Sequence, residues 1–334
     1  MNPLKSLVSP RYPSAAVGLS ADAACAVQLD RRGGSFAVRS AAVLPLPAGL
    51  VHPGFDELNV GDPSTLARAL ADVTSNAGLA RRRRWSVALP EASTRTSILT
   101  METQPASRSE AEEMLRWKIE RALGAPLDEL RVSRERLKPD PQGRERHLVT
   151  AVRLSVLAEY EQVFASLGWH AGLILPRHMG EAWWLMRDGG RDTAANYPSD
   201  SLLVSAHPEG FTALILRAGQ PLYVRAVSCE REDRADELYR FLLFYRDRNA
   251  PQGDEGNGTV APTPALHFAP DRIGRLLVAG TGIDEAQASA VVEETLASPP
   301  RAVRPEELRL SFPSTDIDFA QIAAPAGLAA LAWG

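Results

Sequence analysis

The chain has 334 residues, of which 45% are hydrophobic and 23% charged, and its formal net charge is −4. This length and composition are typical of a globular protein with about two domains. The slightly acidic balance provides no overall basic field for nucleic acid, and no apolar run approaches the ~20 residues that cross a bilayer.

The chain is predicted to open with a β-hairpin. Residues 17–29 and 35–46 have the composition of strands, and residues 32–34 supply a glycine-containing turn. Within the first of these segments, "GLSADAACAV" indicates a strand, a tight turn and a second strand. A helix is expected to begin at Asp62, which serves as N-cap before Pro63.

The next part of the chain is predicted to contain both strands and helices. Its strongest helix follows Ser107 or Ser109, and Ser109 with Glu112 fits the capping-box pattern. Gly124 is the residue type that most often ends such a helix. Strands are expected at 85–89, 96–101, 130–137, 147–153 and 170–175, and helices at 156–167 and 180–186.

The second half repeats the pattern of the first. Residues 188–200 are polar and are interpreted as a linker, and residues 249–265 are predicted to be a flexible loop. Strands are expected at 202–207, 211–217, 221–228 and 275–279, and helices at 234–248, 285–296 and 319–331. Because a strand hairpin, a strand and a helix occur in each half, the sequence indicates an internal duplication of topology.

Residues 84–137 carry a resemblance to a known family. Their helix and the turn after it have the spacing W.IE..L..P.DE, formed by Trp117, Ile119, Glu120, Leu123, Pro126, Asp128 and Glu129. Residues 147–185 add a strand, a helix, a strand ending in proline and a further helix. Together these stretches resemble the actin-like ATPase superfamily and, within it, the PilM family of type IV pilus assembly proteins. The likeness extends over residues 15–334 through the order and spacing of many weak motifs.

This resemblance implies an α/β, actin-like (ribonuclease H-like) fold of two lobes. Residues 1–14 would be a disordered N-terminus, 15–85 and 169–190 the first lobe, 86–168 a small inserted subdomain, and 198–334 the second lobe. Between "YVRAVS" and "ELYRFLLFYRD" only a few residues occur, where the family has a helical subdomain that walls its nucleotide cleft. The second lobe is therefore expected to carry a reduced subdomain.

The family binds ATP with two phosphate hairpins and an adenosine loop, and each has a counterpart here. Ser20 and Ser205 stand where the family has an Asp that organises Mg²⁺. Asp22 either reaches a metal or, as we expect, caps the first turn. Pro208 removes a backbone donor from the second turn. Thr212 fits a phosphate contact and a strand position equally well.

The adenosine loop is the best preserved of the three. Gly280, Thr281 and Gly282 follow a strand and precede a helix, which fits a base contact or an ordinary tight turn. His207 is interpreted as a solvated turn residue rather than a ligand. The sequence has no His-x-x-x-His pair, Gly-x-Ser-x-Gly elbow or Walker motif. With both metal-organising acids missing, we expect neither catalysis nor a metal, and ATP binding remains an alternative.

Two further features are candidates for partner contacts. Arg81 to Arg84 form a basic run that is either a solvated helix–strand connection or a site for acidic lipid headgroups or an acidic tail. Trp117 and Arg121 are candidates for a peptide groove, although a core position is the simpler interpretation of Trp117.

The resemblance implies a non-catalytic scaffold of a type IV pilus or type II secretion inner-membrane platform. It would bind the cytoplasmic tail of a PilN-like single-pass membrane protein in a groove between the first lobe and the inserted subdomain. The chain is then expected to be cytoplasmic and held at the inner membrane through partners, and self-association stays open. One alternative is a nucleotide-binding ATPase or ATP-regulated switch of the same fold. Another is a sugar-kinase-like phosphotransferase, for which the sequence offers no convincing catalytic Asp.

Overall fold

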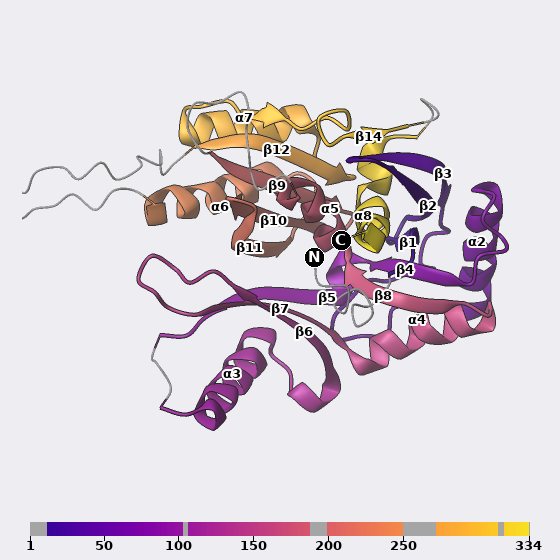
Figure 1. Ribbon diagram of the computed structural model, residues 1–334, viewed down its shortest axis with the longest axis horizontal. Coiled ribbons are helices and arrows are strands. Elements are labelled where there is room, and N and C mark those ends of the chain that lie inside the picture. Colours follow the sequence, from indigo (N-terminus) through magenta and orange to yellow (C-terminus); the bar gives the residue numbers. More distant parts are fainter. Residues whose placement is uncertain (1–11, 103–105, 188–198, 250–271, 313–316, 334) are drawn as a thin grey trace, which may run out of the picture.

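The computed structural model describes residues 12–102, 106–187, 199–249, 272–312 and 317–333. The described chain forms three β-sheets with helices between and around them (Figure 1). The first sheet has the order β14 (Leu310–Ser311), β3 (Ser35–Pro45), β2 (Ala23–Arg32), β1 (Ala15–Leu19), β4 (Arg84–Leu89) and β8 (His170–Pro176). The second has the order β11 (Gln220–Ser228), β10 (Gly210–Arg217), β9 (Asp200–His207), β12 (Ile273–Gly280) and β13 (Arg301–Ala302). The third has the order β5 (Thr94–Thr100), β7 (Arg146–Arg153) and β6 (Leu130–Leu137).

The first two sheets share one topology. In the first sheet β1, β2 and β3 pair antiparallel, and β1, β4 and β8 pair parallel. In the second sheet β9, β10 and β11 pair antiparallel, and β9, β12 and β13 pair parallel. The internal duplication expected from the sequence is therefore confirmed.

Six helices complete the two lobes in layers. α2 (Pro63–Asn76) and α4 (Leu154–Ser166) cover the outer face of the first sheet, and α6 (Arg234–Asn249) and α7 (Glu285–Leu296) that of the second. α5 (Arg177–Met186) and α8 (Phe319–Ala330) lie between the sheets. α5 follows a strand of the first sheet but packs on β9, whereas α8 comes from the end of the chain and packs on β1 and β2. β14 likewise comes from the end of the chain and extends the first sheet, so the two lobes exchange elements.

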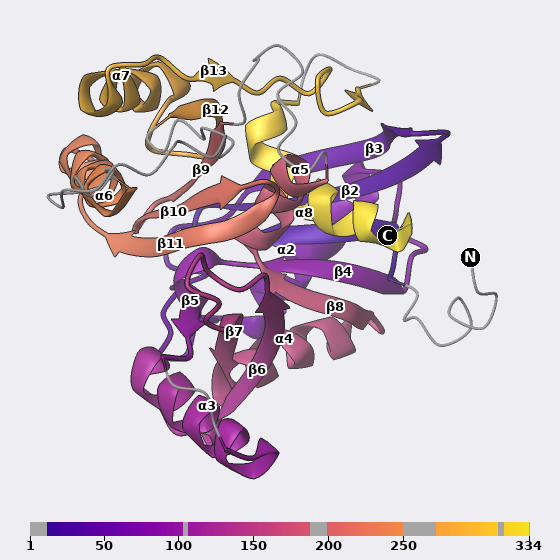
Figure 2. The same ribbon diagram turned by 60° about the vertical axis from the view of Figure 1, so that its left-hand side comes forward.

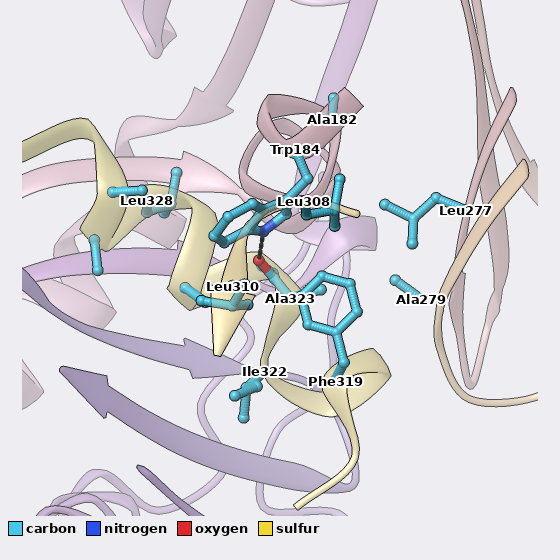
Figure 3. Close-up of a cluster of buried hydrophobic side chains, with 14 of the residues drawn as sticks. Ala182, Trp184, Leu277, Ala279, Leu308, Leu310, Phe319, Ile322, Ala323 and Leu328 are labelled. Carbon is cyan, nitrogen blue, oxygen red and sulfur yellow. Dashed lines mark hydrogen bonds between the residues drawn. The ribbon is translucent and has the colours of Figure 1, made fainter. Parts of the chain in front are cut away.

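The core between the lobes is closely packed around α5 and α8. Trp184 is fully buried there, and its indole Nε1 donates a hydrogen bond to the carbonyl oxygen of Ala323 at 2.9 Å (Figure 3). A Cβ added at Gly180 would lie 2.1 Å from the carbonyl oxygen of Ala324, so only glycine permits this helix crossing. Deep packing of this kind holds the lobes in one arrangement.

Local signals set the helix ends. Asp62 caps α2 as expected, since its carboxylate accepts from the backbone N–H groups of Ser64 and Thr65. In α3 (Arg108–Leu123) the N-cap is Ser107, so the predicted Ser109 capping box is wrong. The Ser107 hydroxyl accepts from the N–H of Glu110 at 3.2 Å, and the Glu110 carboxylate accepts from the N–H of Ala106, one residue before the cap, at 2.6 Å.

The inserted subdomain packs against the second lobe. α3 covers one face of the β5-β7-β6 sheet, with Leu115, Ile119 and Leu123 buried beneath it. At the edge of this sheet β5 packs along β11 (Figure 2). Arg146 Nη2 donates to the carbonyl oxygens of Pro221 and Leu222, both at 3.0 Å.

The second lobe is reduced as expected, because only residues 229–233 join β11 to α6. None of the described helices combines the length and the apolar character needed to cross a membrane. Most of the residues predicted to form a disordered N-terminus, a linker and a flexible loop lie outside the described residues (1–11, 188–198 and 250–271).

Candidate functional site

The three predicted loops converge between the lobes. The β1–β2 turn, the β9–β10 turn and the loop after β12 line a cavity of about 260 Å³. Of the predicted site residues, Ser20, Asp22, Gly280 and Thr281 line this cavity. Gly282 lines a second hollow of about 730 Å³, which Gly280 and Thr281 also line. Ser205 and Thr212 are buried in β9 and β10.

The first turn is closed by its own side chains. The Ser20 hydroxyl donates to Asp22 Oδ1 at 2.7 Å and accepts from the N–H of Ala23 at 3.1 Å. The Ser20 N–H donates to the carbonyl oxygen of Ala23 at 2.9 Å. The Ser20 hydroxyl therefore caps the backbone of this turn, and the Asp22 carboxylate bonds to that hydroxyl.

The second turn carries a buried histidine. His207 is 6% exposed, and its Nδ1 lies 3.0 Å from Glu209 Oε2. The expectation of a solvated turn residue is therefore wrong, because β9 continues through His207 and places its ring against the lobe interface.

A buried arginine ties the second turn to the glycine loop. Arg234, the first residue of α6, is 2% exposed. Its Nη2 donates to the carbonyl oxygens of His207 and Pro208, both at 2.7 Å, and its Nη1 donates to that of Thr281 at 3.2 Å. A phosphate-binding loop points backbone N–H groups at its ligand. Here the carbonyl oxygens of the two loops instead accept hydrogen bonds from the Arg234 guanidinium.

This packing explains the glycines of the loop. A Cβ at Gly282, where φ is +108°, would lie 1.6 Å from Nη1 of Arg234. A Cβ at Gly280, where φ is +83°, would lie 1.9 Å from the carbonyl oxygen of Ala206. Both glycines are thus required by the close approach of neighbouring groups.

A second buried network joins the lobes beside the cavity. Glu91 follows β4 in a short 3₁₀ turn (Glu91–Ser93), and its Oε1 lies 2.5 Å from Nδ1 of His178 on α5. The Thr212 hydroxyl on β10 donates to the same oxygen at 2.7 Å. Burial alone would raise the pKa of Glu91 and lower that of His178, but their opposite charges and shared hydrogen bond outweigh burial. The pKa of Glu91 is lowered and that of His178 raised, so the proton resides on the imidazole.

A third charged pair lies next to it on α5. Arg177 lines the cavity, and its Nη2 lies 3.4 Å from Oε1 of the fully buried Glu181. Burial raises the pKa of Glu181, while Arg177 and the nearby Ser205 hydroxyl act in the opposite direction. Burial also raises the pKa of the Cys25 thiol to about 11, again opposed by Arg177. The guanidinium of Arg177 therefore lines the same cavity as the β1–β2 and β9–β10 turns.

None of these charged groups was predicted from the sequence. Arg177, His178 and Glu181 follow the proline that ends β8, and Arg234 looks like an ordinary first-turn residue of an amphipathic helix. The one available signal is the presence of three charged or titratable residues on a helix that otherwise has the composition of a buried helix.

A separate groove lies between the first lobe and the inserted subdomain. It has a volume of about 350 Å³ and is lined by residues 171–176 of β8, by α4 and by one face of the inserted sheet. In that sheet Thr150, Ala151 and Val152 line the groove, and Val149 and Ala151 also pack in the cluster under α3. Among the described strands β8 has a neighbour on one side only, so its other edge borders the groove.

The candidate groove residues on α3 lie elsewhere. Trp117 is 56% exposed, and the guanidinium of Arg121 lies 5.1 Å from the centroid of its ring. Neither residue lines the groove. The core interpretation of Trp117 is wrong.

Comparisons with known proteins support the fold. No protein-family model and no curated protein matches the sequence. Among solved structures, a chain of a "PilM-PilN type IV pilus biogenesis complex" has a TM-score of 0.69 and 18% identity, over 97% of this chain and 98% of that one. A Bacteroides thetaiotaomicron protein with an actin-like ATPase fold and unknown function has a TM-score of 0.47 and 12% identity, over 97% and 98%. The cytoplasmic domain of EpsL, an inner-membrane component of the type II secretion system of Vibrio cholerae, has a TM-score of 0.40 and 15% identity, over 85% and 94%. The chain thus has the actin-like fold that the resemblance implied.

Proposed function

We propose that this chain is a non-catalytic scaffold that binds the cytoplasmic tail of a PilN-like single-pass membrane protein. The observation that carries the proposal is the groove beside β8, which offers an open strand edge next to a preformed cavity. The similarity in fold to a chain of a PilM–PilN complex supports this choice of partner.

The groove is suited to an extended peptide. An unpaired strand edge offers backbone N–H and C=O groups to a segment that adds itself as a further strand. Leu89, Leu157 and Leu173 provide apolar contacts for alternate side chains of such a segment. Arg131 and Glu161, the charged residues of the lining, provide polar contacts. We propose that a short tail with a few apolar anchors binds along β8.

The interlobe cavity does not fit Mg-ATP. Ser20 and Ser205 provide no carboxylate for the water shell of Mg²⁺. Arg234 already takes the carbonyl groups of the second turn and the glycine loop. Pro208 has no N–H to donate. We therefore propose that ATP is not a cofactor and that the interlobe cavity has a structural role.

In this proposal the chain belongs to an assembly platform of a type IV pilus or a type II secretion system. It lies at the cytoplasmic face of the inner membrane and is held there by its partner. Its role is to fix the position of the partner's tail relative to other components of the platform.

Fluorescence anisotropy tests the proposal with a labelled peptide that carries the cytoplasmic tail of the PilN-like protein of the same organism. We expect a micromolar dissociation constant, about −8 kcal/mol. Ser133→Trp places a bulky ring at an exposed position of the groove lining and should weaken binding about tenfold or more. Ser155→Trp, at an exposed position of α4 outside the groove, is the matched control. Equal binding by both variants, or no binding by the natural chain, contradicts the proposal.

Calorimetric titration with Mg-ATP tests the non-catalytic part. We expect no binding tighter than about 1 mM, which corresponds to about −4 kcal/mol. Micromolar binding would instead favour an ATP-regulated switch.

A further inference from the structure

The turn between α2 and β4 concentrates positive charge. Arg81 to Arg84 are all exposed, and among the described residues none of the four takes part in an ion pair. Arg83 Nη1 donates to the carbonyl oxygens of Ala80 and Arg82, at 3.1 and 3.3 Å, which fixes one guanidinium close to the backbone. The turn lies at the edge of the first lobe that also carries α2 (Figure 1).

The two chain segments that carry and adjoin this basic run contain no acidic residue. The sequence has no acidic residue from 73 to 90, the segment that contains the run. It has none from 162 to 180, the segment that includes β8, the strand paired with β4. The four positive charges are therefore not neutralised locally, in a chain whose net charge is −4.

The basic run lies at one end of the groove. The N–H of His170 donates to the carbonyl oxygen of Arg83 at 2.6 Å, and His170 is paired with Arg84 in the sheet. Ala171 and Gly172, the next residues of β8, line the groove. A peptide that follows β8 towards its first residue therefore arrives at the arginines.

We infer that Arg81 to Arg84 form a contact site for the anionic headgroups of phospholipids, next to the mouth of the groove. The inference rests on the proposed function, because a tail that leaves the membrane and enters the groove brings this end of the molecule to the bilayer. Guanidinium groups bind phosphate oxygens in pairs, and clustered basic residues near a bilayer act additively.

A lipid surface fits the run better than an acidic protein does. A protein interface needs an apolar centre as well as charge. The large exposed apolar side chains of the described chain are Leu58, Trp117, Leu154 and Phe244, and none belongs to this turn. Contact with headgroups needs charge alone.

Vesicle co-sedimentation of the full chain tests the inference. The vesicles contain phosphatidylcholine with 30% phosphatidylglycerol, or phosphatidylcholine only. We expect binding to the anionic vesicles alone, and weaker binding as salt shortens the screening length. The triple variant Arg81→Gln, Arg82→Gln, Arg83→Gln should bind them about 100-fold more weakly. Arg108→Gln, Arg116→Gln, Arg121→Gln on α3 removes the same charge elsewhere and should reduce binding much less.

Several outcomes would overturn the inference. These are no preference of the natural chain for anionic vesicles, equal losses in the two triple variants, and binding of the basic run to a poly-glutamate peptide but not to vesicles. Failure of the proposed function looks different: the tail peptide then fails to bind while binding to anionic vesicles persists. If both proposals hold, Ser133→Trp loses the peptide and keeps the vesicles, and the basic-run variant does the reverse.

Discussion

The interlobe cavity and the groove beside β8 are hollows of similar size, about 260 and 350 Å³, with opposite chemistry. Around the first, the side chains of Arg177, Arg234, Glu91 and His178 are bonded to other groups of the chain. The second is bordered by a strand edge that pairs with no other described strand. The chain's own charges thus surround the interlobe cavity, whereas the groove has an open strand edge at its border.

The two hollows differ in the source of the hydrogen-bonding partners for the polar groups that surround them. Around the interlobe cavity each of these buried charged side chains has at least one hydrogen-bonding partner within the chain, on another element or on the next turn of its helix. In the groove the backbone edge of β8 can be satisfied by water or by a peptide. Three changes test this contrast, and they are ordered by the size of the effect that we expect.

Removing the central cation should cost the most. Arg234→Met leaves three carbonyl oxygens, those of His207, Pro208 and Thr281, without their charged donor. We expect a loss of about 4 kcal/mol in the free energy of unfolding, measured with urea. Arg231→Met, three residues earlier and exposed, should change it by less than about 0.5 kcal/mol. Equal effects in the two variants would show that the cavity does not depend on its internal cation.

The Glu91–His178 pair should make stability depend on pH. The pKa of His178 is raised, so the stabilisation that its protonated form provides is complete below the ordinary pKa of 6.5. This stabilisation is lost as the pH rises through the pKa of the folded state. The pKa of Glu91 is lowered, so the stabilisation that its ionised form provides is complete above the ordinary pKa of 4.5. This stabilisation is lost as the pH falls through the pKa of the folded state. The advantage of the natural chain over Glu91→Gln should therefore be largest between these two values, by about 1–2 kcal/mol.

Thermal or urea unfolding of both chains across this pH range measures the difference. The exposed Glu113→Gln on α3 is the control, and its difference from the natural chain should stay near zero throughout. A difference for Glu91→Gln that grows steadily above pH 6.5 would contradict the assignment of the proton to His178.

The smallest effect is expected at Trp117. Because its ring is largely exposed, Trp117→Ala should change the free energy of unfolding by less than about 0.5 kcal/mol and leave tail affinity unchanged. Trp184→Ala removes the buried ring between α5 and α8 and should cost more than about 3 kcal/mol. A loss of tail affinity in Trp117→Ala would extend the peptide site beyond the groove.

Local patterns predicted most of the elements of the fold. The hairpin turns and the Asp62 cap depend on residues that are close in sequence, so local patterns were enough to predict them. The succession of strands and helices along each half could be predicted in the same way. The sequence does not distinguish two N-caps for α3, because Ser107 with Glu110 and Ser109 with Glu112 both fit the same four-residue pattern.

The charged networks could not be predicted in this way. Glu91 meets His178 and Thr212 across 87 and 121 residues, and only the folded lobes bring them together. Trp117 could have been placed correctly. Leu115, Ile119 and Leu123 recur every four residues, so position 117 falls on the opposite face of α3.

The contact between β5 and β11 gives the molecule a mechanical property. The first sheet, the helices between the lobes, the second sheet and the inserted sheet form a closed ring, joined at its last link by Arg146. If a tail binds between β8 and the inserted sheet, as we propose, a force on it would reach both lobes, because the inserted sheet contacts the second lobe through β5 and Arg146. In that case the contacts between β5 and β11 would oppose separation of the two lobes under tension.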